Sequence, residues 1–125
     1  MKLLSEYMND AHLSGLGEEA CAMLVRRDFT GLADRFGYAL AFGRAPSAAI
    51  EADFNTAVAS GSDEFAAGSP SIALAYFKPN DTGLIASIDC TLAVGDEASV
   101  FLSLVVTGEG EDRYVTLEDI SGSTR

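Results

Sequence analysis

Tryptophan is absent from this sequence, histidine occurs once and cysteine twice in 125 residues. Because His12 is the only histidine, a metal centre built from several histidines is excluded. Cys21 and Cys90 lie far apart without a CxxC spacing, so they predict neither a disulfide framework nor a zinc site, and we interpret both as reduced core cysteines. The composition, 48% hydrophobic and 22% charged, predicts a globular chain that folds without a metal or cofactor.

Long apolar runs are also missing. No stretch approaches the roughly 20 apolar residues needed to span a bilayer. Ser5, Glu6 and Asn9 interrupt the apolar start of the chain before a signal-peptide core could form. We therefore expect no membrane partner and a cytoplasmic location.

Basic residues are scarce. Eight Lys and Arg stand against 19 Asp and Glu, and the net charge is -11. Residues 1–60 carry five basic and eight acidic side chains, whereas residues 61–125 carry three basic and eleven acidic ones. Such a field repels nucleic acid, whose affinity depends on Lys and Arg displacing counterions, and it attracts a basic protein partner. The alternative is that the acidic charge only maintains solubility.

Signatures of nucleotide-binding and hydrolytic enzymes are missing as well. No G-x-x-x-x-G-K-[ST], G-x-G-x-x-G, G-x-S-x-G or H-E-x-x-H sequence occurs. The sequence thus gives no positive indication of an enzyme, and we expect a protein that binds rather than catalyses.

The first half of the chain does contain apolar residues at helical spacing. Gly15 and Gly17 are expected to separate the first two helices, Asp28 is a candidate N-cap, and Pro46 suits a first helical turn. The predicted helices cover residues 2–12, 18–27, 28–42 and 46–60.

Beyond a Gly- and Ser-rich loop at 61–70, apolar residues alternate as in half-buried strands. Clusters of Gly, Asp, Asn and Glu predict turns between them. The predicted strands cover residues 72–77, 84–94, 100–106 and 113–120.

These elements predict an α+β fold in a single domain, 1–125. About four N-terminal helices (1–60) are expected to pack on a C-terminal four-stranded antiparallel meander (71–121). Even-numbered residues of the second and third strands should face the helices. The opposite face is mixed and carries Ser87, Asp89, Thr91, Ser103, Thr107, Phe77 and Phe101.

Two single residues are candidates for acid–base chemistry. Asp89 lies in the middle of an apolar strand, where partial burial could raise its pKa, although an exposed or interface position is the alternative. His12 lies near the end of a predicted helix, where a solvated position is the ordinary interpretation. A nucleophile pair of His12 with Cys21 would require proximity in the fold.

Acidic residues also gather at the last turn and strand. They do not follow the spacing of an EF-hand calcium loop, so a solvated turn is the simple interpretation. The alternative is a surface that receives Lys or Arg side chains of a partner, with Tyr114 as an aromatic anchor. The candidate partner-binding residues are Asp89, Glu109, Glu111, Asp112, Tyr114, Glu118 and Asp119.

The segments 26–36 (RRDFTGLADRF) and 114–121 (YVTLEDIS) resemble the helix and last-strand segments of nuclear-transport-factor-like domains. That family has helices cradling a curved antiparallel sheet, and it includes pocket enzymes, binding modules and bacterial toxin-immunity proteins. Its members commonly have an early strand among the helices, which we do not find before residue 70. The His–Asp pair of its pocket enzymes is not evident here either.

Three hypotheses follow. The first is an immunity-type inhibitor that binds a basic toxin domain, such as a nuclease, through the acidic half of the chain. The second is a small-molecule pocket protein, or an isomerase- or hydratase-like enzyme, using Asp89, Tyr76 and Tyr114. The third is a homodimer in which the mixed sheet face, with Phe77 and Phe101, pairs with a second copy.

Overall fold

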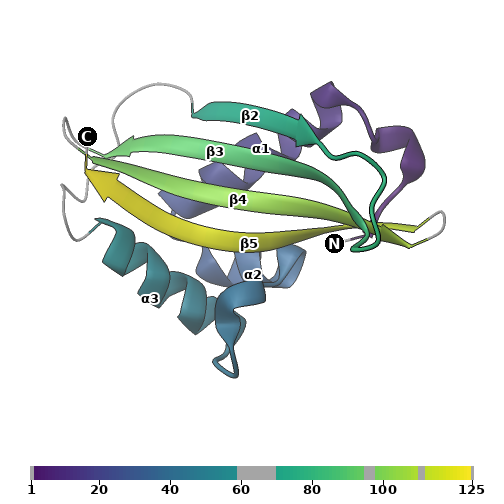
Figure 1. Ribbon diagram of the computed structural model, residues 1–125. Helices are drawn as coiled ribbons and strands as arrows, with labels where there is room; N and C mark the ends of the chain where they lie inside the picture. The colour runs from purple at the N-terminus through teal and green to yellow at the C-terminus, as the bar shows by residue number, and fades with distance from the viewer. Residues whose placement is uncertain (1, 59–69, 95–97, 110–111, 125) are drawn as a thin grey trace.

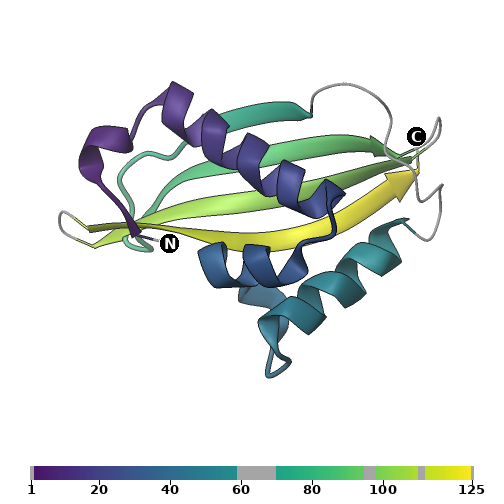
Figure 2. The same cartoon turned by 180° about the vertical axis from the view of Figure 1, so that it is seen from behind.

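Helices lie across one face of an antiparallel sheet, and the other face is uncovered (Figures 1 and 2). This computed structural model describes residues 2–58, 70–94, 98–109 and 112–124. The helical elements are the 3-10 helices η1 (Ser5–Tyr7) and η2 (Ala39–Ala41) and the α-helices α1 (Asp10–Val25), α2 (Phe29–Phe36) and α3 (Pro46–Val58). The strands are β1 (Lys2–Leu3), β2 (Ser71–Tyr76), β3 (Leu84–Val94), β4 (Ala98–Glu109) and β5 (Asp112–Thr124).

The strand order is β1-β5-β4-β3-β2, and every pair is antiparallel. The α+β class with an antiparallel sheet is therefore as predicted, but the prediction of about four helices on four strands is wrong. The described residues form three α-helices and a five-stranded sheet. The expectation of no strand before residue 70 is wrong for the same reason, since β1 pairs with the start of β5.

The predicted helix over 2–12 is replaced by β1, η1 and the first turn of α1. Leu3 and Tyr7 have helical spacing in the sequence, but Leu3 pairs with Arg113 as a strand residue and is only 5% exposed. Burial of Leu3 against the core thus outweighs the local helical pattern. Asn9 then caps α1, because its side-chain oxygen accepts a hydrogen bond of 3.0 Å from the His12 amide.

Gly15 and Gly17 do not break the helix as expected, and α1 runs through both. Gly17 is buried where α1 crosses the sheet, and a Cβ atom there would lie 2.9 Å from Ile88 Cγ2 and 3.0 Å from Cys90 Sγ. The glycine therefore permits a close approach of helix to strand.

Asp28 caps α2 as predicted, accepting a hydrogen bond of 3.0 Å from the Gly31 amide. The helix ends at Phe36 rather than near Phe42, because Gly37 adopts a positive φ of 71°. The chain then forms η2 before α3 begins at Pro46, the predicted residue.

The core lies between the helices and the sheet. Even-numbered residues of β3 and β4 face the helices, as the alternation predicted. The buried residues on these two strands include Ala86, Ile88, Cys90, Leu92, Val94, Val100, Leu102, Leu104 and Val106. The predicted turn at 95–97 and nearly all of the predicted loop at 61–70 lie outside the described residues.

A bulge interrupts the pairing of β4 with β5. Ser103 pairs with Asp119, whereas the next residue, Leu104, pairs with Leu117, so Glu118 is the extra residue of β5. Leu117 and Ile120 are both buried, whereas Glu118 between them is exposed and Asp119 is half-buried.

Candidate functional site

Asp89 lies near the middle of β3 on the open face of the sheet. Its carboxylate is exposed and accepts a hydrogen bond of 2.8 Å from Ser103 Oγ on β4 and one of 3.3 Å from Ser87 Oγ on β3. Of the two positions that the sequence left open for Asp89, partly buried or exposed, the structure shows the exposed one. The two serines fix the direction of the carboxylate and leave it able to accept further hydrogen bonds.

The bulge in β5 brings two more carboxylates to this place. A hollow of about 670 Å³ lies at Asp89, Glu118 and Asp119. Its remaining lining residues are Leu40, Cys90, Phe101, Leu102 and Ser103. Three of the seven predicted partner-binding residues thus meet at one hollow, and we call Asp89, Glu118 and Asp119 the bulge carboxylates.

The bulge carboxylates have no basic partner in the part of the chain that the structure describes. Among the described residues, no Lys or Arg forms an ion pair with any of the three. Phe101, on β4 beside them, is 39% exposed and supplies an apolar surface at the same hollow. Together these groups form a surface with negative charge and an aromatic ring, which suits the aliphatic and charged parts of Lys or Arg.

The other predicted residues lie at the far end of β4 and β5. Glu109 pairs with Asp112, and Tyr114 pairs with Thr107 and with Lys2 of β1. Six residues of β4 separate this end from Ser103, which corresponds to about 20 Å along an extended strand. Asp112 already forms an exposed ion pair of 3.3 Å with Lys2. Glu111 lies outside the described residues.

The single histidine of the sequence lies at the start of α1, where it contacts Asn9 and Tyr7. His12 lies in the first turn of α1, its Nδ1 is 2.9 Å from Asn9 Oδ1, and its ring is 4.7 Å from that of Tyr7. It is nine residues from Cys21 on the same helix, a rise of about 13.5 Å. A nucleophile pair of His12 with Cys21 is therefore excluded.

Cys21 and Cys90 are free and buried, as interpreted from the sequence. They contact each other across the interface of α1 with β3. The hydrogen bond with Cys21, then burial, raise the pKa of the Cys90 thiol far above its ordinary value. The thiols belong to the core.

The three residues of the pocket hypothesis are not brought together. Asp89 lies on the open face, and Tyr114 lies at the first paired residues of β5. Tyr76 is on β2, where its hydroxyl donates to Asp10 Oδ1 of α1, and this hydrogen bond raises the pKa of Tyr76. These three residues therefore do not form one site.

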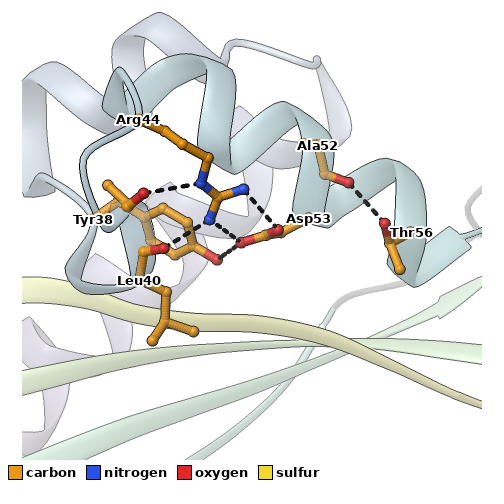
Figure 3. Close-up of polar contacts among 7 residues, drawn as sticks. Tyr38, Leu40, Arg44, Ala52, Asp53 and Thr56 are labelled. Atoms are coloured by element: carbon orange, nitrogen blue, oxygen red, sulfur yellow. Dashed lines mark hydrogen bonds and ion pairs between the residues drawn. The ribbon is translucent and has the colours of Figure 1, made fainter.

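A polar cluster that the sequence did not predict joins η2 to α3 (Figure 3). Tyr38 Oη donates to Asp53 Oδ2 at 2.5 Å, and Arg44 Nη1 lies 3.3 Å from Asp53 Oδ1. Arg44 also donates to the carbonyl of Leu40 at 2.7 Å, so it ties the loop containing η2 to the helix. No short motif marks these residues, because they are 6 to 15 positions apart in the sequence.

The electrostatics of this cluster are coupled to the bulge. Burial raises the pKa of Tyr38, and the hydrogen bond to Asp53 and the charges of Asp53 and Asp119 raise it further. Burial also raises the pKa of Asp53, but the hydrogen bonds from Tyr38 and Arg44 outweigh it and leave that pKa below its ordinary value.

The described residues contain neither a metal-binding cluster nor a membrane-spanning helix. No group of three or more His, Cys, Asp and Glu side chains in that part of the chain is placed to hold a metal ion. Across the same ranges, no helix is long and apolar enough to cross a membrane.

Comparison with protein-family models, with curated proteins and with solved structures finds no match to this chain. The resemblance to nuclear-transport-factor-like domains therefore remains a prediction from the two segments that suggested it.

Proposed function

We propose that this protein is an acidic protein-binding module of the immunity type, which binds a basic toxin domain in the cytoplasm and neutralises it. The observation that carries the proposal is the meeting of Asp89, Glu118 and Asp119 around one hollow, where no Lys or Arg of the described residues forms an ion pair with them. The net charge of -11 supports the same class of partner.

A nuclease domain is the form of toxin that this surface fits best. Such domains bind phosphates through Lys and Arg. The bulge carboxylates are negatively charged acceptors, as phosphates are, and can bind the same side chains. Asp89 is oriented by Ser103 and Ser87, so less of its freedom is lost on binding. Phe101 supplies the apolar anchor that charge alone lacks.

The proposal is tested by neutralising the three bulge carboxylates together, in the variant Asp89→Asn, Glu118→Gln, Asp119→Asn. A basic protein captured by the wild-type chain at low salt is purified, and its dissociation constant is measured at several salt concentrations. We expect the dissociation constant of the variant to be higher by about tenfold or more, because removing one charge of an interfacial pair weakens the complex. We also expect a shallower salt dependence.

The matched control removes the same charge elsewhere, in Glu6→Gln, Asp34→Asn, Glu51→Gln. These three side chains are exposed on η1, α2 and α3, so both variants carry the same net charge. Equal weakening by both triple variants would mean that only net charge matters and would contradict a site at the bulge. A captured protein that is not toxic, or whose activity is unchanged in the complex, would contradict the inhibitor function.

A further inference from the structure

The two edges of the sheet are protected to very different degrees. At one edge β1 pairs only with Arg113 and Tyr114, and beyond them β5 forms the edge and carries the bulge with Glu118 and Asp119. β2 forms the other edge with six residues, Ser71–Tyr76, which include no charged residue and no proline. Short length, charge and proline are the devices that keep sheet edges from pairing, and β2 has none of them.

The register identifies which backbone groups of β2 point away from the sheet. The amide of Phe77 donates to the Ile85 carbonyl at 2.8 Å, so odd-numbered residues of this strand point their backbone groups at β3. Alternation then directs the N–H and C=O of Ile72, Leu74 and Tyr76 outward. Within the described residues, no strand pairs with this side of β2.

The side chains of the same three residues lie on the helix side of the sheet. Ile72 Cδ1 would lie 3.3 Å from a Cβ at Gly17 of α1, and the Tyr76 hydroxyl bonds Asp10 at the start of that helix. Ile72 and Leu74 are half-buried, and Tyr76 is 52% exposed. An apolar row therefore continues to the open edge of the sheet.

We propose that β2 pairs with β2 of a second copy of this chain, antiparallel about a two-fold axis perpendicular to the sheet, and forms one continuous ten-stranded sheet. Keeping the helices of both copies on one side requires residues of equal parity to face each other. Centred on Leu74, this register places Leu74 opposite its own copy and Ile72 opposite Tyr76 of the partner. Each of these facing pairs exchanges two main-chain hydrogen bonds.

A second copy fits this edge better than a basic partner does. The strand has no acidic side chain to attract Lys or Arg, and its lack of charge lets two acidic chains meet there. In this register, Ala73 of one copy lies opposite Ala75 of the other, and these small side chains leave room on the open face of the sheet. The location differs from the bulge, so both surfaces can be occupied together.

The pairing is tested by charge exchange at the two-fold axis. Sedimentation equilibrium of the full chain should show a dimer whose association strengthens with added salt, because salt screens the repulsion of two acidic copies. Leu74→Lys and Leu74→Glu should each raise the dimer dissociation constant by about tenfold or more, since like charges then face each other. An equimolar mixture of the two variants should form a heterodimer.

Further measurements separate the alternatives. Circular dichroism and thermal unfolding establish that both variants fold, and recovery in the mixture could not occur if they did not. Leu74→Cys should give an intermolecular disulfide on mild oxidation, whereas Ala75→Cys, whose copies are two residues out of register, should not. A chain that is monomeric at all concentrations, or a dimer broken by Phe101→Asp but not by the Leu74 variants, would overturn the proposal.

Discussion

The two faces of the sheet are built from the same strands but have opposite chemistry. On the helix side, consecutive even-numbered residues of β3 and β4 are buried and apolar. On the open side, the same strands carry Asp89 and Ser103, and Glu118 and Asp119 of β5 line the same hollow as Asp89. The difference suggests that one face determines stability, while residues on the other are available for recognition.

The largest expected effect compares neighbours on opposite faces of β4. Leu104 is fully buried and Val105 is half-buried on the open side. Leu104→Ala should lower the free energy of unfolding by about 3 kcal/mol, because it removes buried methyl groups and leaves a cavity. Val105→Ala should lower it by less than about 1 kcal/mol. Urea unfolding measures both, and equal losses would contradict the division of the faces.

The next comparison uses two glycines that differ in their surroundings. A Cβ at Gly122 of β5 would lie 2.3 Å from the carbonyl oxygen of Ala57 in α3, whereas one at Gly15 of α1 would meet nothing within 4 Å. Gly122→Ala should lower the unfolding free energy by about 1–3 kcal/mol, because backbone must move. Gly15→Ala should raise it by about 0.5–1 kcal/mol, because alanine is a better helix former.

In thermal unfolding, we expect the two Gly→Ala substitutions to shift the midpoint temperature in opposite directions. If Gly122→Ala left the midpoint unchanged, the close contact of β5 with α3 at this glycine would be wrong.

The alternation of the strands was predictable from sequence because burial on one face repeats every second residue. Ile88, Cys90 and Leu92 show this period, and all three are buried. The helix boundaries were less predictable, because a glycine such as Gly17 can either end a helix or permit close packing. Only the position of Ile88 beneath it decides between the two.

The candidate site was predictable residue by residue but not as an arrangement. Asp89, Glu118 and Asp119 stand out as acidic residues in apolar strands, yet their meeting depends on the register of three strands. One signal was present: Leu117 and Ile120 are three apart, which departs from strict alternation and indicates a bulge. Tyr38 and Asp53 gave no such signal, because contacts between a loop and a helix have no period.

A smaller effect is expected at Tyr38, whose hydroxyl donates a hydrogen bond to Asp53 on the helix side of the sheet. Tyr38→Phe should cost about 1 kcal/mol near neutral pH. The pKa of Asp53 is lowered by folding, so its contribution is present above the unfolded pKa near 4 and lost as pH falls. The pKa of Tyr38 is raised, so its contribution is present below the unfolded pKa near 10 and lost as pH rises.

The difference in unfolding free energy between wild type and Tyr38→Phe should therefore be greatest at pH values between the two unfolded pKa values. It should become smaller at lower and at higher pH. Chemical denaturation at a series of pH values measures it. Tyr114→Phe, at an exposed tyrosine of β5, is the matched control and should change stability by less than about 0.5 kcal/mol at every pH. A constant difference across pH would mean that Tyr38 contributes by packing alone.

The smallest expected effect on stability is at Asp89, and it tests the open face most directly. Asp89→Asn keeps an oxygen that can accept the hydrogen bond from Ser103 and removes one charge from a group of three like charges. We expect a change of less than about 0.5 kcal/mol in urea unfolding, because the side chain is exposed. Binding of a basic partner should nevertheless weaken. A loss of stability as large as that of Tyr38→Phe would instead assign Asp89 a structural role and remove the reason for separating the two faces.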